Sequence, residues 1–230
     1  MKNALESPKE SSGQESLTRQ AYMRLRDDIL TGDLAPARKL KIDELRGDYK
    51  IGSSPLREAL SLLTSDGLVE RLDQRGFRVS PVSAGEFDEL LKTRCWLEER
   101  ALRESIANGG SDWEEAIVLS FYRLSRVPRS SDSDHFVANK DWEHHHKRFH
   151  MALIAACGST QLLRFCDQLY DQNIRYRQIT GPTAYPKRDT QQEHEDIMQA
   201  TLDGKADLAV ERLVSHYSQT GSILSSVLDK

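Results

Sequence analysis

Four of the seven histidines lie at spacings that would turn them toward a common interior. His146 and His150 are four residues apart in a segment with helical periodicity, so both imidazoles project from the same helix face. His194 lies one turn before apolar residues in a second helical segment, and His216 follows an apolar stripe in a third. Neutral imidazole is a common ligand of zinc, nickel, copper and iron. The pattern therefore predicts a metal or polar-ligand site built from three helices.

Two other interpretations of these histidines remain open. Each could be a hydrogen-bonded core residue, which is the more common role of a single buried histidine. A metal held by them could also activate water, which would make the protein a metal-dependent enzyme. The sequence has no H-E-x-x-H pattern, phosphate-binding glycine loop or nucleophile elbow, so we expect no enzyme. His135, His144 and His145 fall near a loop or on other faces and are not part of the predicted cluster.

The elements that would position these histidines are helices, because nearly every segment after Ser83 has helical periodicity. Breaks are expected near Gly110, Pro128, Gly158 and Gly204, and at Gly181-Pro182. The expected helices cover residues 84–107, 112–126, 134–157, 159–179, 188–203 and 205–227. The second part of the chain, residues 83–230, is therefore predicted to be an all-α bundle.

The preceding residues follow a different pattern. Residues 1–16 are polar and indicate a flexible tail, and residues 17–82 are expected to form one DNA-binding domain. Its expected elements are helices from Leu17 to Gly32, Ile42 to Tyr49 and Pro55 to Asp66, then strands over 68–72 and 77–80. Three helices followed by a hairpin are typical of a winged helix-turn-helix. The predicted fold is mostly α, with an N-terminal winged helix-turn-helix and a C-terminal all-α bundle.

The third of these helices would enter the major groove, where side chains at its N-terminus reach base edges. We expect a serine to cap it, because serine accepts hydrogen bonds from free helical amides. Arg57 lies on its polar face and could bind guanine or phosphate; the alternative is a surface arginine paired with an acidic neighbour. The predicted DNA contacts are Ser53, Ser54, Pro55 and Arg57 on the helix and Arg75 and Gly76 at the hairpin tip. Further basic residues could contact the phosphates, namely Lys39, Lys41, Arg46 and Lys50.

Composition limits the classes of protein to consider. The net charge of the 230 residues is −4, yet residues 17–82 carry 12 basic and 10 acidic side chains. No apolar run is long enough for a membrane span, and no secretory signal is present, so we expect a cytoplasmic protein. The three cysteines, Cys95, Cys157 and Cys166, lack CxxC spacing and fit a reducing compartment.

Three motifs in the first part resemble the DNA-binding domain of the GntR family of regulators. They are P-x-R-E-A-L over residues 55–60, D-G-L-V over residues 66–69 and R-G-x-x-V over residues 75–79. The family often has an arginine just before the recognition helix, where this chain has Ser53. The resemblance implies a homodimer that binds a palindromic operator on double-stranded DNA and acts as a repressor.

The second part resembles the FCD effector domain of the FadR branch of that family. The family pattern is D-x-x-F-H on one helix and two later histidines, which here correspond to His150, His194 and His216. The resemblance implies a divalent metal beside a pocket for a small carboxylate. His146 stands where the family has aspartate, and four neutral ligands favour zinc or nickel over magnesium or calcium. The site could also be metal-free, with His146 serving the effector directly.

A carboxylate effector requires a cationic partner, and arginine suits it best. Arg94 is the first candidate, because it opens a stretch resembling the family's R-x-x-L-E. Arg177 and Arg175 are the next candidates. The alternative for Arg94 is a salt bridge to Glu98, one turn away. The motifs "SPLREALSLL", "GGSDWE" and "RYR" are similar to those of family members that control glutarate and 2-hydroxyglutarate use. That resemblance implies glutarate or a related short dicarboxylate. A metal-responsive regulator without an organic effector, or a DNA-binding module without any ligand, are the alternatives.

Overall fold

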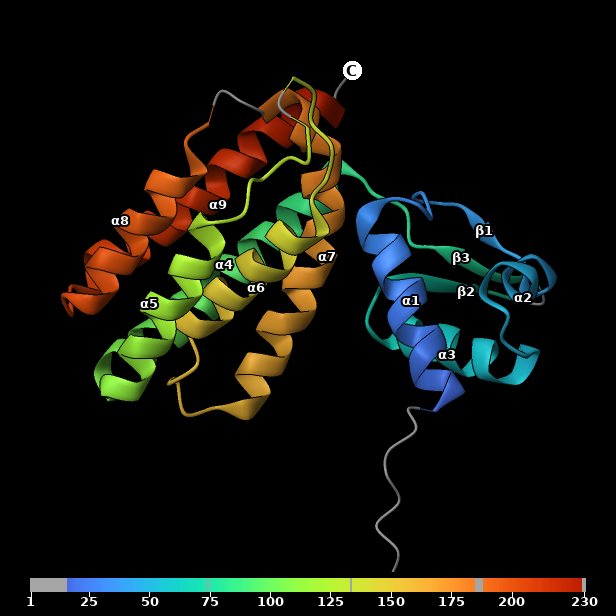
Figure 1. The fold of residues 1–230 in the computed structure, drawn as a ribbon, viewed down its shortest axis with the longest axis horizontal. Helices are drawn as coiled ribbons and strands as arrows, with labels where there is room; N and C mark the ends of the chain where they lie inside the picture. The colour runs from blue at the N-terminus through green and yellow to red at the C-terminus, as the bar shows by residue number, and fades with distance from the viewer. Residues whose placement is uncertain (1–15, 74, 133, 185–187, 229–230) are drawn as a thin grey trace, which may run out of the picture.

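The protein has two parts joined by a short linker, a small one with a β-sheet and a larger helical bundle (Figure 1). The computed structural model describes residues 16–73, 75–132, 134–184 and 188–228. The predicted tail therefore lies almost entirely outside the described residues, as does Gln74 in the hairpin turn. The mostly α fold class predicted from the sequence, a winged helix followed by an all-helical bundle, is confirmed.

The small part contains α1 (Leu17–Thr31), α2 (Ile42–Tyr49) and α3 (Ser53–Ser65) and a three-stranded antiparallel sheet. Its strands are β1 (Lys39–Leu40), β2 (Val69–Leu72) and β3 (Gly76–Val79), in the order β1-β3-β2. The sequence did not predict β1, because two residues are too short to show alternation. The expected serine cap of α3 was wrong: the N-cap is Gly52, without a side-chain hydrogen bond.

The core of the small part is a single apolar cluster that also includes two residues of the bundle. The stripe predicted on α3 is fully buried, as are Ala21 and Leu25 of α1. Tyr170 and Ile174, about 90 residues further along the chain, belong to the same cluster although they lie on a bundle helix. The two parts therefore share hydrophobic packing.

The bundle consists of helices that run close to the predicted segments. They are α4 (Ala84–Asn108), α5 (Ser111–Ser125), α6 (Lys140–Leu153), α7 (Thr160–Ala184), α8 (Thr190–Leu202) and α9 (Ala206–Leu228). Contacts between α4 and α9, α5 and α6, and α8 and α9 hold the bundle together. Helix α7 is the bundle helix that lies next to α1 (Figure 1).

Two predicted boundaries in the bundle were wrong. The helix expected over 134–157 begins at Lys140, because the Ser130 hydroxyl bonds the backbone of a loop up to Val137 and Asn139 then caps the helix. The break expected at Gly181-Pro182 does not occur there, and α7 continues to Ala184.

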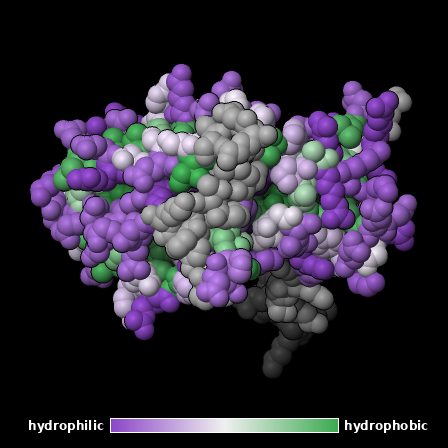
Figure 2. Space-filling view, turned by 90° about the horizontal axis from the view of Figure 1, so that it is seen from above, coloured by the Kyte–Doolittle hydropathy of each residue, from purple (hydrophilic) through white to green (hydrophobic). Residues whose placement is uncertain are grey.

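Hydrophilic side chains dominate the visible face of both parts (Figure 2). In the part of the chain that the structure describes, no helix has the length and apolar character needed to cross a bilayer. Cys157 and Cys166 are buried and Cys95 is half-buried, all three as free thiols.

Candidate metal site, arginine cluster and DNA-binding face

The structure brings the four predicted histidines together in the centre of the bundle. His146, His150, His194 and His216 are at most 5% exposed, and one ring nitrogen of each lies within 4.8 Å of those of the others. The His146 Nε2 atom lies 3.0 Å from His194 Nε2 and 3.1 Å from His150 Nε2. Four nitrogens around a tetrahedral zinc ion, each at about 2.0–2.1 Å, would be about 3.3 Å apart, which lies between these two distances and the 4.8 Å limit of the set. The donor set and spacing therefore fit a transition-metal ion.

The outer ring nitrogens of three of these histidines are held by hydrogen bonds. His146 Nδ1 lies 2.5 Å from the Tyr170 hydroxyl, and His150 Nδ1 lies 2.9 Å from the Tyr217 hydroxyl. His216 Nδ1 lies 2.7 Å from a carboxylate oxygen of Glu193. When the outer nitrogen carries the hydrogen, the inner nitrogen presents its lone pair to the centre, as in metal sites with a supporting outer layer.

Burial keeps these imidazoles neutral. Desolvation, reinforced by the neighbouring imidazoles and arginines, holds the pKa values of His146, His150 and His194 well below the ordinary value. For His216, burial outweighs the hydrogen bond to Glu193 and lowers the pKa to about 4. Neutral imidazole is the form that binds metals, so the protein presents ready ligands near pH 7.

Arg94, the first candidate for an effector contact, is buried beside the histidines. It is 1% exposed, its Nε donates to Glu98 at 2.5 Å, and its Nη1 donates to Asn173 at 3.0 Å. Its guanidinium lies over the rings of Tyr217, at 4.0 Å, and Tyr170, at 4.9 Å. Burial alone would lower the pKa of Arg94, but the Glu98 carboxylate outweighs it and raises that pKa. The Nη2 atom is buried without a hydrogen-bond partner, so one donor remains available.

Arg177 and two arginines that the sequence analysis missed also lie beside the cluster. Arg177 donates to Glu143 at 2.5 Å and to the Tyr170 hydroxyl at 3.1 Å. Arg188 pairs with Glu193 at 2.5 Å and donates to the backbone of His216. Burial, with the repulsion of Arg177 and Arg188, lowers the pKa of Arg129 to about 10. Positive charge is therefore concentrated beside neutral histidines.

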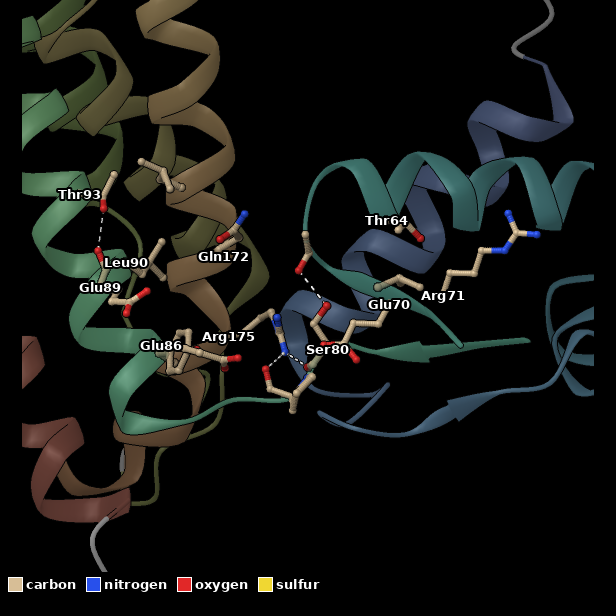
Figure 3. A pocket seen from close by; sticks show the side chains of 15 residues that line it. Thr64, Glu70, Arg71, Ser80, Glu86, Glu89, Leu90, Thr93, Gln172 and Arg175 are labelled. Atoms are coloured by element: carbon tan, nitrogen blue, oxygen red, sulfur yellow. Dashed lines mark hydrogen bonds between the residues drawn. The ribbon is translucent and has the colours of Figure 1, made fainter. Parts of the chain in front are cut away.

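Arg175, a weaker candidate, is not part of this cluster. It is 5% exposed on another face of α7, and its guanidinium donates to the linker carbonyls of Ser80 and Pro81. Figure 3 shows it pointing across the cleft between the two parts, with Glu86 on the bundle side. The cleft has a volume of about 760 Å³. Arg175 therefore binds the linker rather than the site of the histidines.

Helix α7 thus contacts both the histidines and the small part. Asp171 accepts from Arg26 of α1 at 2.6 Å and from Lys147 of α6 at 2.7 Å. Gln172 donates to the carbonyl of Asp66 at 3.0 Å, and a Cβ on Gly67 would lie 2.7 Å from its amide nitrogen. Gly67 also has a φ of 74°, a left-handed conformation that favours glycine at this position after α3.

The predicted DNA contacts lie on one end of the small part. Arg57 and Arg75 are exposed, and no ion pair among the described residues involves either of them. Gly76 has a φ of 92°, which favours glycine at the tip of the hairpin. Ser54 is exposed, and Ser53 and Pro55 are half-buried at the start of α3. The structure therefore leaves both predicted arginines available to a nucleic acid.

Two further predicted phosphate contacts are occupied within the chain. Lys41 pairs with Glu44 at 2.7 Å, and Arg46 lies 3.5 Å from Asp43. Both pairs are on the surface, where such interactions are weak and can yield to a phosphate.

The residues that the sequence analysis missed contact the histidines or their neighbours from other parts of the chain. Tyr170, Arg129 and Arg188 have no special spacing relative to the histidines. A local signal existed for Glu193 and Tyr217, because each is adjacent in sequence to a predicted histidine.

Comparison with known proteins assigns each part of the chain to a family. Residues 17–79 match the bacterial regulatory proteins of the gntR family, and residues 89–219 match the FCD domain. The chain is 37% identical over 218 residues to the HTH-type transcriptional regulator BphR of Paraburkholderia xenovorans, covering 95% of this chain and 89% of that protein. It is 32% identical over 199 residues to the HTH-type transcriptional repressor GlaR of Escherichia coli, covering 85% and 90%.

Solved structures share the fold. The chain is similar to McbR/YncC of E. coli with a TM-score of 0.73 and 19% identity, over 93% of this chain and 99% of that one. BphR and GlaR are transcriptional regulators, which leaves the enzyme interpretation without support. The chain belongs to the GntR family of DNA-binding transcription regulators, in its FadR-like group with an FCD domain.

Proposed function

We propose that the protein is a repressor that leaves a palindromic operator when a small carboxylate binds in the bundle. Residues 17–82 act as the DNA-binding domain and residues 83–230 as the effector domain of a homodimer. The observation that carries this proposal is the buried cluster of histidines and arginines packed against a helix, α7, that also contacts the small part.

The charge around the histidines favours a dianion over a monoanion. With neutral histidines, four buried or half-buried arginines face three glutamates, which leaves one net positive charge, and a divalent ion would add two more. A dicarboxylate of about five carbons, such as glutarate, would neutralise two charges and suit the bidentate donors of arginine. The residues counted are Arg94, Arg129, Arg177 and Arg188 against Glu98, Glu143 and Glu193.

The donor set favours zinc or nickel in this site. All four candidate ligands are nitrogens, and the position that is aspartate in the family pattern is His146. Hard cations such as magnesium prefer oxygen, whereas imidazole suits zinc and nickel. When bound, the ion would supply a Lewis-acid centre that attracts an effector carboxylate. His146, His150, His194 and His216 would hold it.

Arg177 and Arg94 would act on the effector in different ways. Arg94 retains one unpartnered donor while Glu98 and Asn173 fix its orientation. Arg177 is fixed by Glu143 and Tyr170, so an anion at this position would compete with Glu143 and perturb the Tyr170 hydroxyl. Because the Tyr170 ring belongs to the core of the small part, this perturbation reaches the DNA-binding domain.

The test combines metal analysis, ligand screening and DNA binding on the full chain. Operator DNA is selected from a random library with the effector-free protein, and C4–C6 dicarboxylates are screened by thermal shift and then by release of that DNA. We expect glutarate or a near homologue to raise the unfolding temperature and to weaken operator binding. The effector assignment would be overturned if none of these dicarboxylates raised the unfolding temperature of the protein or released the operator DNA.

The metal assignment is tested by elemental analysis and by titration of chelator-treated protein with zinc or nickel. We expect binding that is lost in His150→Gln and retained in His144→Gln, which changes an exposed histidine of the same helix. His146→Asp should broaden binding toward harder ions, because it adds an oxygen ligand. Equal behaviour of the His150 and His144 variants would refute the metal site.

A further inference from the structure

The exposed face of α5 is apolar at its centre. Val118, Leu119 and Tyr122 are 47%, 48% and 60% exposed. With Leu202 at the end of α8, they help to line a surface hollow of about 580 Å³. Several large apolar side chains side by side on a hydrophilic surface commonly mark a contact with another protein.

Charged residues flank this apolar centre with opposite signs on its two sides. Asp112 and Glu115 precede it, and Arg123 and Arg126 follow it. Helical spacing places Glu115, Leu119 and Arg126 on one stripe of the helix. All four charged side chains are exposed, and no ion pair within the described part of the chain uses any of them.

We propose that this face of α5 is the two-fold interface with a second copy of the chain, with the two α5 helices antiparallel and Leu119 on the axis. Asp112 and Arg126 are equally far from Leu119 in sequence, as are Glu115 and Arg123. Glu115 therefore faces the partner's Arg123, and Asp112 faces the partner's Arg126. An isologous interface requires this self-complementarity, because every contact occurs twice.

Trp96, another exposed aromatic residue, is less suited to such pairing. Trp96 of α4 is 61% exposed, and Lys92 lies over its ring at 5.0 Å. Lys92 and Arg100 are equally far from Trp96 in sequence. Antiparallel pairing about Trp96 would place Lys92 against the partner's Arg100, which is repulsive. Arg100 and Arg103 already pair with Glu104 and Glu99 within the chain. The charges that have no ion pair among the described residues thus favour α5 as the face for a second copy.

The inference rests on the proposed homodimer and specifies its surface. Sedimentation equilibrium of the full chain measures the dimer dissociation constant. We expect Leu119→Glu to raise it at least 100-fold, because two carboxylates would meet at an apolar axis. Glu115→Arg and Arg123→Glu should each raise it about tenfold, and the double variant E115R/R123E should return it to near the wild-type value.

Rescue in the double variant would show that the two side chains pair across the interface, because a second charge reversal would not restore a chain that had failed to fold. Glu115 and Arg123 are eight residues apart, about 12 Å along one helix, so they cannot pair within a chain. Trp96→Ala is the matched control and should leave the dissociation constant unchanged. A dimer unaffected by Leu119→Glu, or charge variants whose effects only add, would overturn the interface.

Operator binding distinguishes this failure from failure of the proposed function. If the wild-type chain binds operator DNA and the Leu119→Glu variant is still dimeric, only the α5 interface is contradicted. A chain that binds no operator contradicts the proposed function, whereas the sedimentation series still decides the interface. A wild-type chain that is monomeric at high micromolar concentration overturns both the homodimer and its surface.

Discussion

The two functional regions use arginine in opposite physical environments. Arg57 on the predicted DNA-binding face is exposed and has no ion pair among the described residues. Arg94 in the bundle is 1% exposed, and its guanidinium is fixed by Glu98, Asn173 and two aromatic rings. An exposed arginine adds little to folding and acts only when a partner arrives, whereas a buried one belongs to the fold itself. Substitutions should therefore separate binding from stability.

The largest expected effect is on stability, from Arg94→Met. The substitution removes the partner of the buried Glu98 carboxylate, and breaking such a pair typically costs about 3–5 kcal/mol. We expect the free energy of unfolding, measured by chemical denaturation, to fall by that amount. Arg100→Met on the same helix is the control, because its side chain is 72% exposed. Similar losses in both variants would contradict the contrast between buried and exposed arginines.

The next effect is on DNA affinity, from Arg57→Ala. Loss of a base or phosphate contact should weaken operator binding by about 1–3 kcal/mol, roughly 5- to 150-fold, as measured by fluorescence anisotropy at fixed salt. The free energy of unfolding should change by less than about 0.5 kcal/mol. Arg164→Ala, an exposed arginine of the bundle, should alter neither quantity. Full operator affinity in the Arg57 variant would refute its predicted role.

The same contrast explains how much the sequence could predict. The DNA-binding face is made of residues close together in the chain, and the motif P-x-R-E-A-L places Arg57 on the polar side of α3. The four histidines were predictable because each lies on an apolar helix face, and the bundle brings such faces together. Local pattern was therefore sufficient to predict that Arg57 is exposed and that the four histidines lie together.

The remaining residues of the site depend on tertiary packing. Arg188 reaches His216 from a segment between two helices, and Tyr170 reaches His146 from α7. Helical periodicity predicts which face is buried but not which residues of different helices meet there. The boundary errors have a similar origin, since the loop before α6 is held by contacts of Ser130 that no periodicity reveals.

A third effect is acid sensitivity confined to the bundle. Burial lowers the pKa of His216 to about 4 from an ordinary value of 6.5, so the unfolded chain binds a proton at pH values where the folded chain does not. The free energy of unfolding should therefore fall as the pH decreases from 6.5 to 4, by about 1.4 kcal/mol per pH unit for this histidine. The shifts of His146, His150 and His194 have the same sign and steepen the loss.

Hydrogen exchange of metal-free protein at pH 7 and pH 5.5 tests where this loss occurs. Residues 1–82 contain no histidine, so faster exchange at pH 5.5, after correction for the intrinsic rate, should be concentrated in α6, α8 and α9. His216→Gln should show a shallower dependence of stability on pH than the wild type. Equal destabilisation of both parts would argue against the histidines as its cause.

A modest loss of stability, and the effect that most directly links the two regions, is expected from Tyr170→Phe. The ring stays in the core of the small part, while the hydroxyl that contacts His146 and Arg177 is lost, at a cost of about 1 kcal/mol. If this hydroxyl transmits the state of the histidine site, metal and carboxylate should still bind, but their effect on operator affinity should shrink. Gln172→Ala instead removes a contact of α7 with Asp66 and leaves the histidine side intact. A Tyr170 variant with undiminished release of DNA would show that the signal reaches the DNA-binding domain through other contacts of α7, such as Asp171 with Arg26.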